Sequence, residues 1–270
     1  MIRKRIKNVL MKEWEVLFTD PNSALLITLL PLIIVGQGIL YVWLAFRFGG
    51  GEMLSMPIFQ NAVEKTIAAL PGAAQLPASE QILVLLLQQF NFYLLLIPTM
   101  IAVSAATFSI VDEKQTGSLE ALLATPVRTW ELLLGKALAG AIPALVMTWI
   151  SAGIFLLIAL FIGWGSYFSI IINAGWFLNL FLVTPTIAVL SFILGIIGSS
   201  RAKDAKSAQN MIVVIILPVF ALIGIQVTGI AWFTPLLTLA LGIAIGVIDW
   251  LMLRAAVRLF QREAILLQWR

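Results

Sequence analysis

The chain has 270 residues, of which 61% are hydrophobic and only 11% are charged, and its mean hydropathy is +1.04. A soluble domain of this length cannot bury so much apolar surface, so the composition indicates a membrane protein. The absence of cysteine and histidine excludes disulfide bonds and thiol metal sites and removes the usual general base, so we expect no catalytic site and no metal site.

The predicted fold is all-α: a polytopic membrane helix bundle with six transmembrane helices, both termini in the cytoplasm and an N-terminal amphipathic interfacial helix. A membrane helix needs about 20 mostly apolar residues. The apolar runs place the spans at about 24–46, 82–111, 137–162, 168–198, 211–228 and 236–253. No segment between them is large enough to fold independently, so residues 1–270 are predicted to form one transmembrane domain.

Residues 1–20 have the pattern of an amphipathic helix that lies at the membrane surface. The apolar residues of this segment fall on one helical stripe: Ile2, Ile6, Val9, Leu10, Trp14, Leu17 and Phe18. Lys4, Lys7 and Lys12 face away from that stripe, which is typical of an interfacial helix. The pair Asp20-Pro21 then caps and restarts the chain at the first span.

The basic residues alternate with the apolar runs. Only Arg47 and Lys65 lie outside four short basic segments, at 3–12, 114–136, 201–206 and 254–270. Because cytoplasmic loops retain positive charge, these segments are predicted to be cytoplasmic, with 254–270 as a cytoplasmic tail. Topology thus accounts for the net charge of +4, and we expect no nucleic-acid partner.

Polar residues are rare in the predicted spans. The candidates for lining an outward path are Gln88, Gln89, Asn91, Asn173 and Asn179. The alternative is that they form hydrogen bonds between helices or lie at the membrane interface, because these spans exceed the bilayer thickness. Asp249 is the only candidate charge within a span, and we expect it to snorkel or to form an ion pair at the helix end. Pro98, Pro185 and Pro218 should kink their spans.

The strongest local pattern is the cytoplasmic segment 112–136. Ser118 is suited to cap a short helix at 119–124, and Thr125 is suited to cap a second helix that begins at Pro126. Leu119, Leu122 and Leu123 make one apolar face on the first of these helices. An apolar face without a partner outside the membrane indicates docking to another protein. The alternative is a helix that lies in the headgroup layer.

This segment resembles the motif of ATP-binding-cassette (ABC) transporter permeases of the type-two export class. The matching residues read Glu113-x-x-Thr116-Gly117-x-Leu119-Glu120-x-Leu122-Leu123-x-Thr125-Pro126-Val127. Three further stretches are similar to the family in chain order: Lys12-Glu13 with Asp20-Pro21, the loop from Ser199 to Gln209, and the ending Phe260-x-Arg262-Glu263-x-Ile265-Leu266 with Trp269.

The resemblance implies a permease subunit that moves a substrate out of the cytoplasm with ATP hydrolysed by a separate cytoplasmic ABC ATPase. It implies a homo- or heterodimer of permease protomers in the cell (plasma) membrane, with one ATPase docked on each protomer and an alternately exposed path between them. The chain itself would not be an enzyme and would bind no cofactor, since ATP and Mg²⁺ belong to the ATPase. The ATPase-coupling residues carried over by motif position are Glu113, Thr116, Gly117, Leu119, Glu120, Leu123, Thr125 and Pro126.

Two other classes of function stay open. A stand-alone secondary transporter or channel would normally show midplane charges or repeat symmetry, and neither is evident in the sequence. A membrane scaffold for an ATPase would keep the docking segment and transport nothing. No pattern in the sequence identifies the substrate, and none distinguishes a homodimer from a heterodimer.

Overall fold

The computed structural model describes residues 2–48, 56–115, 128–201 and 205–259, and the secondary structure in that part of the chain is all helical. The first half comprises α1 (Ile2–Thr19), α2 (Pro21–Phe48), α4 (Pro57–Ala69), the 3-10 turn η1 (Pro71–Gln75), α5 (Ala78–Tyr93) and α6 (Leu96–Gln115). The second half comprises α8 (Thr129–Ile162), η2 (Trp164–Tyr167), α9 (Phe168–Ile171), α10 (Ala174–Leu178), the π-helical turn η3 (Asn179–Val183), α11 (Thr184–Arg201), α12 (Ala205–Val227) and α13 (Pro235–Leu259). This confirms the predicted all-α class for the described residues.

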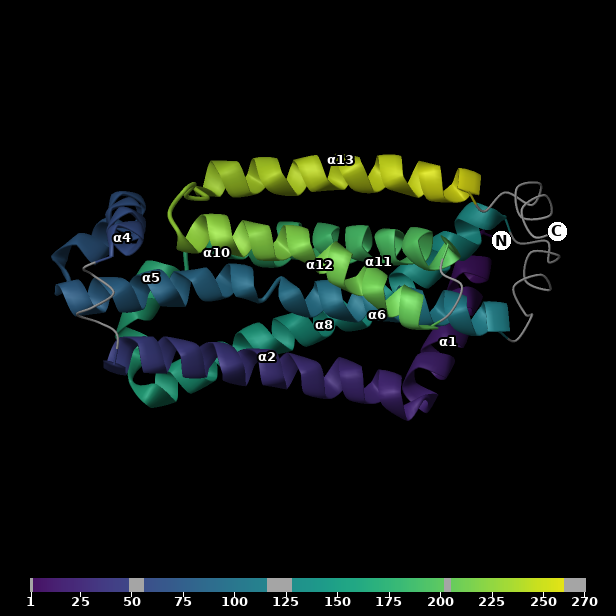
Figure 1. The fold of residues 1–270 in the computed structure, drawn as a ribbon, viewed down its shortest axis with the longest axis horizontal. Coiled ribbons are helices and arrows are strands. Elements are labelled where there is room, and N and C mark those ends of the chain that lie inside the picture. Colours follow the sequence, from purple (N-terminus) through teal and green to yellow (C-terminus); the bar gives the residue numbers. More distant parts are fainter. Residues whose placement is uncertain (1, 49–55, 116–127, 202–204, 260–270) are drawn as a thin grey trace.

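The long helices lie side by side along one axis of the molecule, with α1 across one end and α4 at the other (Figure 1). Within the described residues, five segments are long and apolar enough to cross a membrane: Ser23–Phe48, Ala78–Ile110, Trp130–Ile162, Ala174–Ser199 and Pro235–Arg258. A further apolar helix, Val213–Val227, is shorter. It lies within the predicted fifth span, 211–228. Because this helix is shorter than the other five, six membrane spans stay a prediction.

The span Ala78–Ile110 is the centre of the bundle. Its most apolar part is 72% buried, whereas that of Pro235–Arg258 is only 22% buried. Many exposed side chains of α13 are large and apolar, among them Leu236, Ile243 and Val247. An apolar outer surface around a buried central helix is the arrangement expected of a bundle whose solvent is lipid.

The central span is broken where the sequence predicts a kink. Helix α5 ends at Tyr93 and α6 begins at Leu96. In a continuous helix the carbonyl of Leu94 would accept from residue 98, but Pro98 has no N–H. That carbonyl instead accepts from Ile97 at 3.1 Å, and the Leu95 N–H turns to Phe92 O at 3.0 Å. The proline therefore determines where the helix breaks.

The fourth predicted span is also divided. Asn173 is extended and caps α10, because its Oδ1 accepts from the Trp176 N–H at 3.1 Å. The span thus starts at Ala174 rather than at Phe168. The π-helical turn η3 immediately precedes Pro185, where the Thr184 N–H reaches back five residues to Asn179 O. Such a widened turn accommodates a proline that lacks its own donor.

A small helical layer, not predicted from the sequence, covers the end of the bundle opposite α1 (Figure 1). Lys65 on α4 donates to the carbonyls of Gly229 and Ile230, the second at 3.1 Å. Gly229 has φ of +66°, and a Cβ there would lie 2.7 Å from Ala62 Cα, so only glycine fits this contact. Nearby, burial raises the pKa of Tyr167, and a hydrogen bond with Glu80 acts in the same direction.

A close contact between α6 and α11 supports the core, because a Cβ at Gly195 would lie 2.8 Å from Ala106 Cβ and 3.1 Å from Val103 O. We predict that Gly195→Leu lowers the stability of the protein by about 1–3 kcal/mol through overpacking. Gly153→Leu is the matched control, since nothing lies within 4 Å of a Cβ at that helical glycine. The measurement is thermal unfolding in detergent, and equal midpoints for the two variants would contradict the prediction.

Candidate functional site

The site begins with the packing of α1 across the bundle end. Helix α1 lies so close to α8 that a Cβ at Gly135 would be 2.8 Å from Val9 Cγ1. Trp14 Nε1 donates to Ala139 O at 3.0 Å. Ala139 is four residues before Pro143, which lies inside α8 and cannot donate to it. The indole of α1 therefore satisfies a carbonyl that the proline of α8 leaves without its helical partner.

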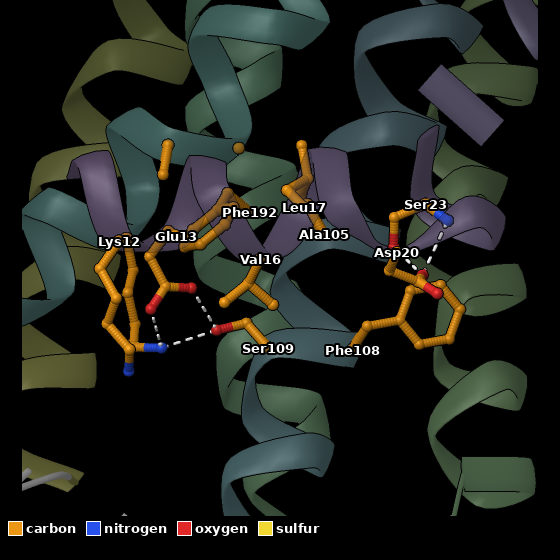
Figure 2. Close-up of a pocket in the computed structure, with 13 residues that line it drawn as sticks. Lys12, Glu13, Val16, Leu17, Asp20, Ser23, Ala105, Phe108, Ser109 and Phe192 are labelled. Atoms are coloured by element: carbon orange, nitrogen blue, oxygen red, sulfur yellow. Dashed lines mark hydrogen bonds and ion pairs between the residues drawn. The ribbon is translucent and has the colours of Figure 1, made fainter. Parts of the chain in front are cut away.

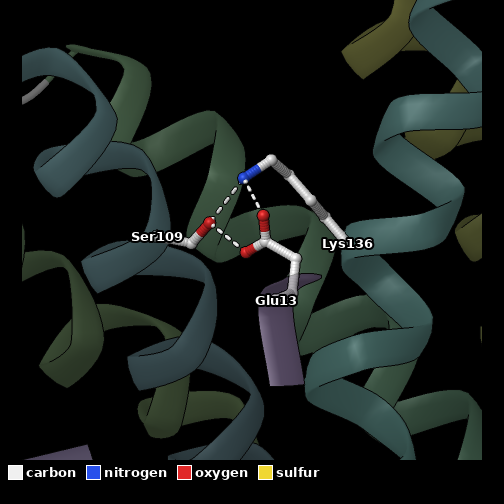
Figure 3. Close-up of polar contacts among 3 residues, drawn as sticks. All are labelled: Glu13, Ser109 and Lys136. Atoms are coloured by element: carbon white, nitrogen blue, oxygen red, sulfur yellow. Dashed lines mark hydrogen bonds and ion pairs between the residues drawn. The ribbon is translucent and has the colours of Figure 1, made fainter. Parts of the chain in front are cut away.

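The centre of the site is a buried ion pair (Figure 3). Lys136 Nζ on α8 lies 2.9 Å from Glu13 Oε1 on α1, and it donates to Ser109 Oγ on α6 at 2.6 Å. The Ser109 hydroxyl in turn donates to Glu13 Oε2 at 2.8 Å. The Lys136 side chain is 1% exposed and that of Glu13 is 12% exposed. These three residues, which we call the α1 clamp, connect three helices through one neutral, hydrogen-bonded cluster.

A second contact joins α1 to the first turn of α8. Glu131 is fully buried, and its Oε2 lies 3.6 Å from Arg5 Nη1. The same oxygen accepts from the backbone N–H of Arg128 at 3.1 Å. A carboxylate at the third position of a helix satisfies one of the free N–H groups and lies favourably at the positive end of the helix dipole. Glu131 therefore both starts α8 and binds α1.

The two contacts lie on either side of the predicted coupling residues 113–126, which we call the coupling segment. Helix α6 ends at Gln115 and α8 begins at Thr129, with the extended Arg128 as its N-cap. The backbone of Glu113 lies in the last turns of α6. Seven of the predicted coupling residues lie outside the described residues: Thr116, Gly117, Leu119, Glu120, Leu123, Thr125 and Pro126. The roles of all eight stay predictions, as does the helix pair expected at 119–126.

The predicted α1 stripe agrees with the described side chains at five positions. Ile6, Val9, Leu10, Trp14 and Leu17 are partly buried, whereas Lys4, Lys7 and Lys12 are exposed. Phe18 is the exception at 54% exposed. The helix N-terminal cap predicted at Asp20 is confirmed, since its Oδ2 accepts from the Ser23 N–H at 2.9 Å and from the Ser23 hydroxyl at 2.7 Å.

The predicted path residues lie at the other half of the bundle. Gln88, Gln89, Asn91 and Asn179 are buried, at 7%, 5%, 1% and 1% exposed. Asn179 Nδ2 donates to Asn91 O at 2.7 Å, and this carbonyl is free because the helix breaks at Leu95. Gln89 Nε2 donates to Gln226 O at 3.3 Å. Asn173 lies apart from them in its capping role.

Asp249 does not show the expected ion pair. It is 9% exposed, and its Oδ1 is a buried oxygen without a hydrogen-bond partner. The nearby cation Arg254 instead stacks on the Trp250 ring at 3.6 Å. Among the described residues, no three acidic side chains gather to hold a metal ion.

Sequence reasoning missed the α1 clamp, although one signal was present. Glu13 falls on the same helical stripe as Leu10 and Leu17, at spacings of three and four residues. An acid in the apolar stripe of a helix needs a buried cation or donor. Lys136, at the edge of an apolar run, was the available cation, but pairing it with Glu13 required the fold.

The comparisons with known proteins agree with the architecture. A family model described as "ABC-2 family transporter protein" matches residues 7–254, which is most of the chain. No curated protein and no solved structure matches the chain.

We predict that Glu13→Gln destabilises the protein by about 3–5 kcal/mol, because it leaves the buried Lys136 ammonium without its counter-charge. Lys136→Met should cost less, since Glu13 is partly exposed. The double variant should recover most of the loss, because it removes both charges together. Chemical denaturation of the detergent-purified protein measures this, and additive losses in the double variant would contradict it.

Proposed function

The chain belongs to the ABC-2 transporter family, and from that premise we propose that it is the permease subunit of an exporter driven by a separate ATPase. The family match covers α1 from residue 7 on, all the candidate spans apart from the end of the last one, and the segment between α6 and α8. The observation that carries the proposal is the α1 clamp, which joins α1, α6 and α8 beside the predicted coupling segment.

Through the α1 clamp, a movement of the coupling segment would also move α1. Helices α6 and α8 lead directly into and out of residues 116–127, so a displacement of the segment acts on both helices. The buried ion pair and the Arg5–Glu131 contact connect α1 to the same two helices. A docked ATPase would thus move α1, α6 and α8 together. ATP drives transport only if it binds one global state of the complex better than the other.

The orientation of the chain in the cell membrane is part of this proposal. The basic residues of α1, the start of α8 with Arg128, and the end of α13 with Arg258 lie at one end of the bundle (Figure 1). Lys65 lies on α4 at the other end. The positive-inside rule then places α1 and both termini in the cytoplasm and α4 outside.

The ATP chemistry is assigned to the partner subunit. The sequence contains no G-x-x-x-x-G-K-[ST] loop, the pattern whose backbone N–H groups cradle nucleotide phosphates. We propose that the ATPase binds ATP and Mg²⁺, that this chain is not an enzyme, and that two permease protomers assemble with the ATPase subunits.

We propose that the buried amides form the outer part of the substrate path, closed in this conformation. Four amide oxygens lack a donor, those of Gln88, Gln89, Asn91 and Asn179, and Gln226 Nε2 lacks an acceptor. Each such buried group costs about 1–3 kcal/mol. A rearrangement that parts α5 from α12 and η3 would expose these groups to water or substrate. Since most of them are acceptors, the path favours substrates that present hydrogen-bond donors.

Asp249 favours a second candidate, a stand-alone ion-coupled carrier, because a buried carboxyl in a span often marks an ion path. Purification of the tagged chain from its native membrane separates the two functions. A stoichiometric ATPase identified by mass spectrometry supports the permease. Its absence after mild solubilisation and cross-linking overturns that proposal in favour of the carrier.

We predict that Glu120→Lys uncouples the ATPase from the permease. Reversing the charge at the motif position should reduce substrate-stimulated ATP hydrolysis by at least about tenfold, within the usual range of coupling free energies. The permease should remain folded. Glu64→Lys on the exposed face of α4 is the control for the charge change. Unchanged substrate-stimulated ATP hydrolysis in the reconstituted Glu120→Lys complex would contradict the coupling role of Glu120.

A separate prediction tests the path. The chain has no cysteine, so a single introduced thiol reports its own accessibility. Gln89→Cys should react with a membrane-impermeant maleimide at least about tenfold faster in one nucleotide state of the complex than in the other, as coupled opening requires. Leu87→Cys, on the same helix and 0% exposed, should stay unreactive in both states. A Gln89→Cys variant that is unreactive throughout would leave the amides with a purely structural role.

A further inference from the structure

A cavity of about 360 Å³ lies beside the α1 clamp (Figure 2). It is open to the surface and is lined by the second half of α1, the start of α2, and parts of α6, α8 and α11. Its volume is in the range of small-molecule sites, about 300–1,000 Å³. Nothing in the coupling mechanism uses this space, and the clamp forms part of its wall rather than its contents.

Polar side chains lie at both ends of the cavity, with apolar side chains between them. Lys12, Glu13 and Lys136 line it on one side, and Figure 2 shows Leu17, Ala105 and Phe108 further along it. Asp20 lines it as well, and its Oδ2 already accepts from Ser23. A narrow second cavity of about 10 Å³ shares Leu17, Ser23, Ala105 and Phe108 with the first. Its other lining residues include Ile27 on α2 and Ile101 on α6.

The exposed surface of α1 places this cavity at a membrane surface. Met11, Val16 and Phe18 are 51%, 52% and 54% exposed, and such large apolar side chains are stable where they enter lipid. Val16 also lines the cavity. The exposed cations Lys4, Lys7 and Lys12 are on the same helix, against one exposed acid, Glu15. A helix with this mixture lies at the boundary between headgroups and acyl chains, and its positive charge attracts anionic lipid.

We propose that the cavity binds one acyl chain of an anionic phospholipid from the leaflet next to α1, with the phosphate beside Lys12. The apolar walls formed by Val16, Leu17, Ala105 and Phe108 hold the chain. The ligand would fill the space between α1 and the bundle, and so support the position of α1 on α6 and α8. The occupant is a bilayer component rather than the transported substrate.

The test uses the isolated permease in mild detergent and native mass spectrometry, with phosphatidylglycerol and phosphatidylcholine as probes. We expect one phosphatidylglycerol to be retained per protomer in preference to phosphatidylcholine. Val16→Trp, which fills the mouth from an exposed position, should reduce retention by at least about fivefold, and Lys12→Gln should remove the preference for the anionic headgroup. Phe18→Trp and Lys4→Gln are the matched controls, because both residues are exposed on α1 and neither lines the cavity.

Retention by Val16→Trp equal to that of the unaltered chain would overturn the proposal, as would equal retention of the two lipids. An isolated permease that retains no phospholipid also overturns it. The readout needs neither ATP nor substrate. Its failure would therefore leave the ATPase-coupled function standing, and failure of that function would leave the lipid site standing.

Discussion

The arrangement of this protein depends on one buried charge. The Lys136 ammonium is 1% exposed in an apolar bundle, where an unpaired cation is costly. Glu13 on α1 and Ser109 on α6 surround it, and Glu13 is 123 residues away in sequence. Because the charge needs its partners, α1 cannot leave the bundle without exposing an ammonium group to lipid. The composition of α1 is compatible with many positions on the membrane surface. The ion pair holds it at one position on α6 and α8.

A second constraint, satisfaction of the backbone, determines where the other helices meet. Prolines and helix breaks free individual carbonyls, and lipid offers no water to satisfy them. Trp14 donates to Ala139 O, the carbonyl to which Pro143 has no N–H to donate. Trp149 donates to Leu180 O at 3.1 Å, within the π-helical turn that precedes Thr184 and Pro185. These contacts combine packing with hydrogen bonding, so each break in a helix becomes a specific attachment point for a neighbour.

The two ends of the molecule are built differently. At the α1 end, two ion pairs connect α1 to α8, the helix that follows the predicted coupling residues. At the α4 end, the connection is made by Lys65 with backbone carbonyls, and the side chains beneath are neutral amides with unpartnered oxygens. The ion pairs make α1 and α8 move together. The buried amides, by contrast, would gain hydrogen bonds if the helices around them separated. The difference agrees with the proposed function, in which the ATPase acts at the α1 end and substrate leaves at the α4 end.

The pattern of apolar runs and basic segments was sufficient to determine the helical membrane class. Of the three prolines expected to kink their spans, Pro98 and Pro185 lie at irregular turns, whereas Pro218 lies inside the continuous helix α12. These features follow from local chemistry: span length, charge retention and a missing N–H group. The capping role of Asp20 could be predicted for the same reason, since a helix cap forms with a residue only three positions away.

Only the tertiary structure decided which distant groups meet. Glu13 and Lys136 are separated by 123 residues, and Gln226, which the sequence did not single out, joins the amide seam through its contact with Gln89. The helix α4, the cavity beside α1 and the burial of Asp249 likewise depend on how the helices pack. In an apolar chain, many alternative packings satisfy the same local pattern. The pairing of a few polar groups selects among them, and that pairing exists only in three dimensions.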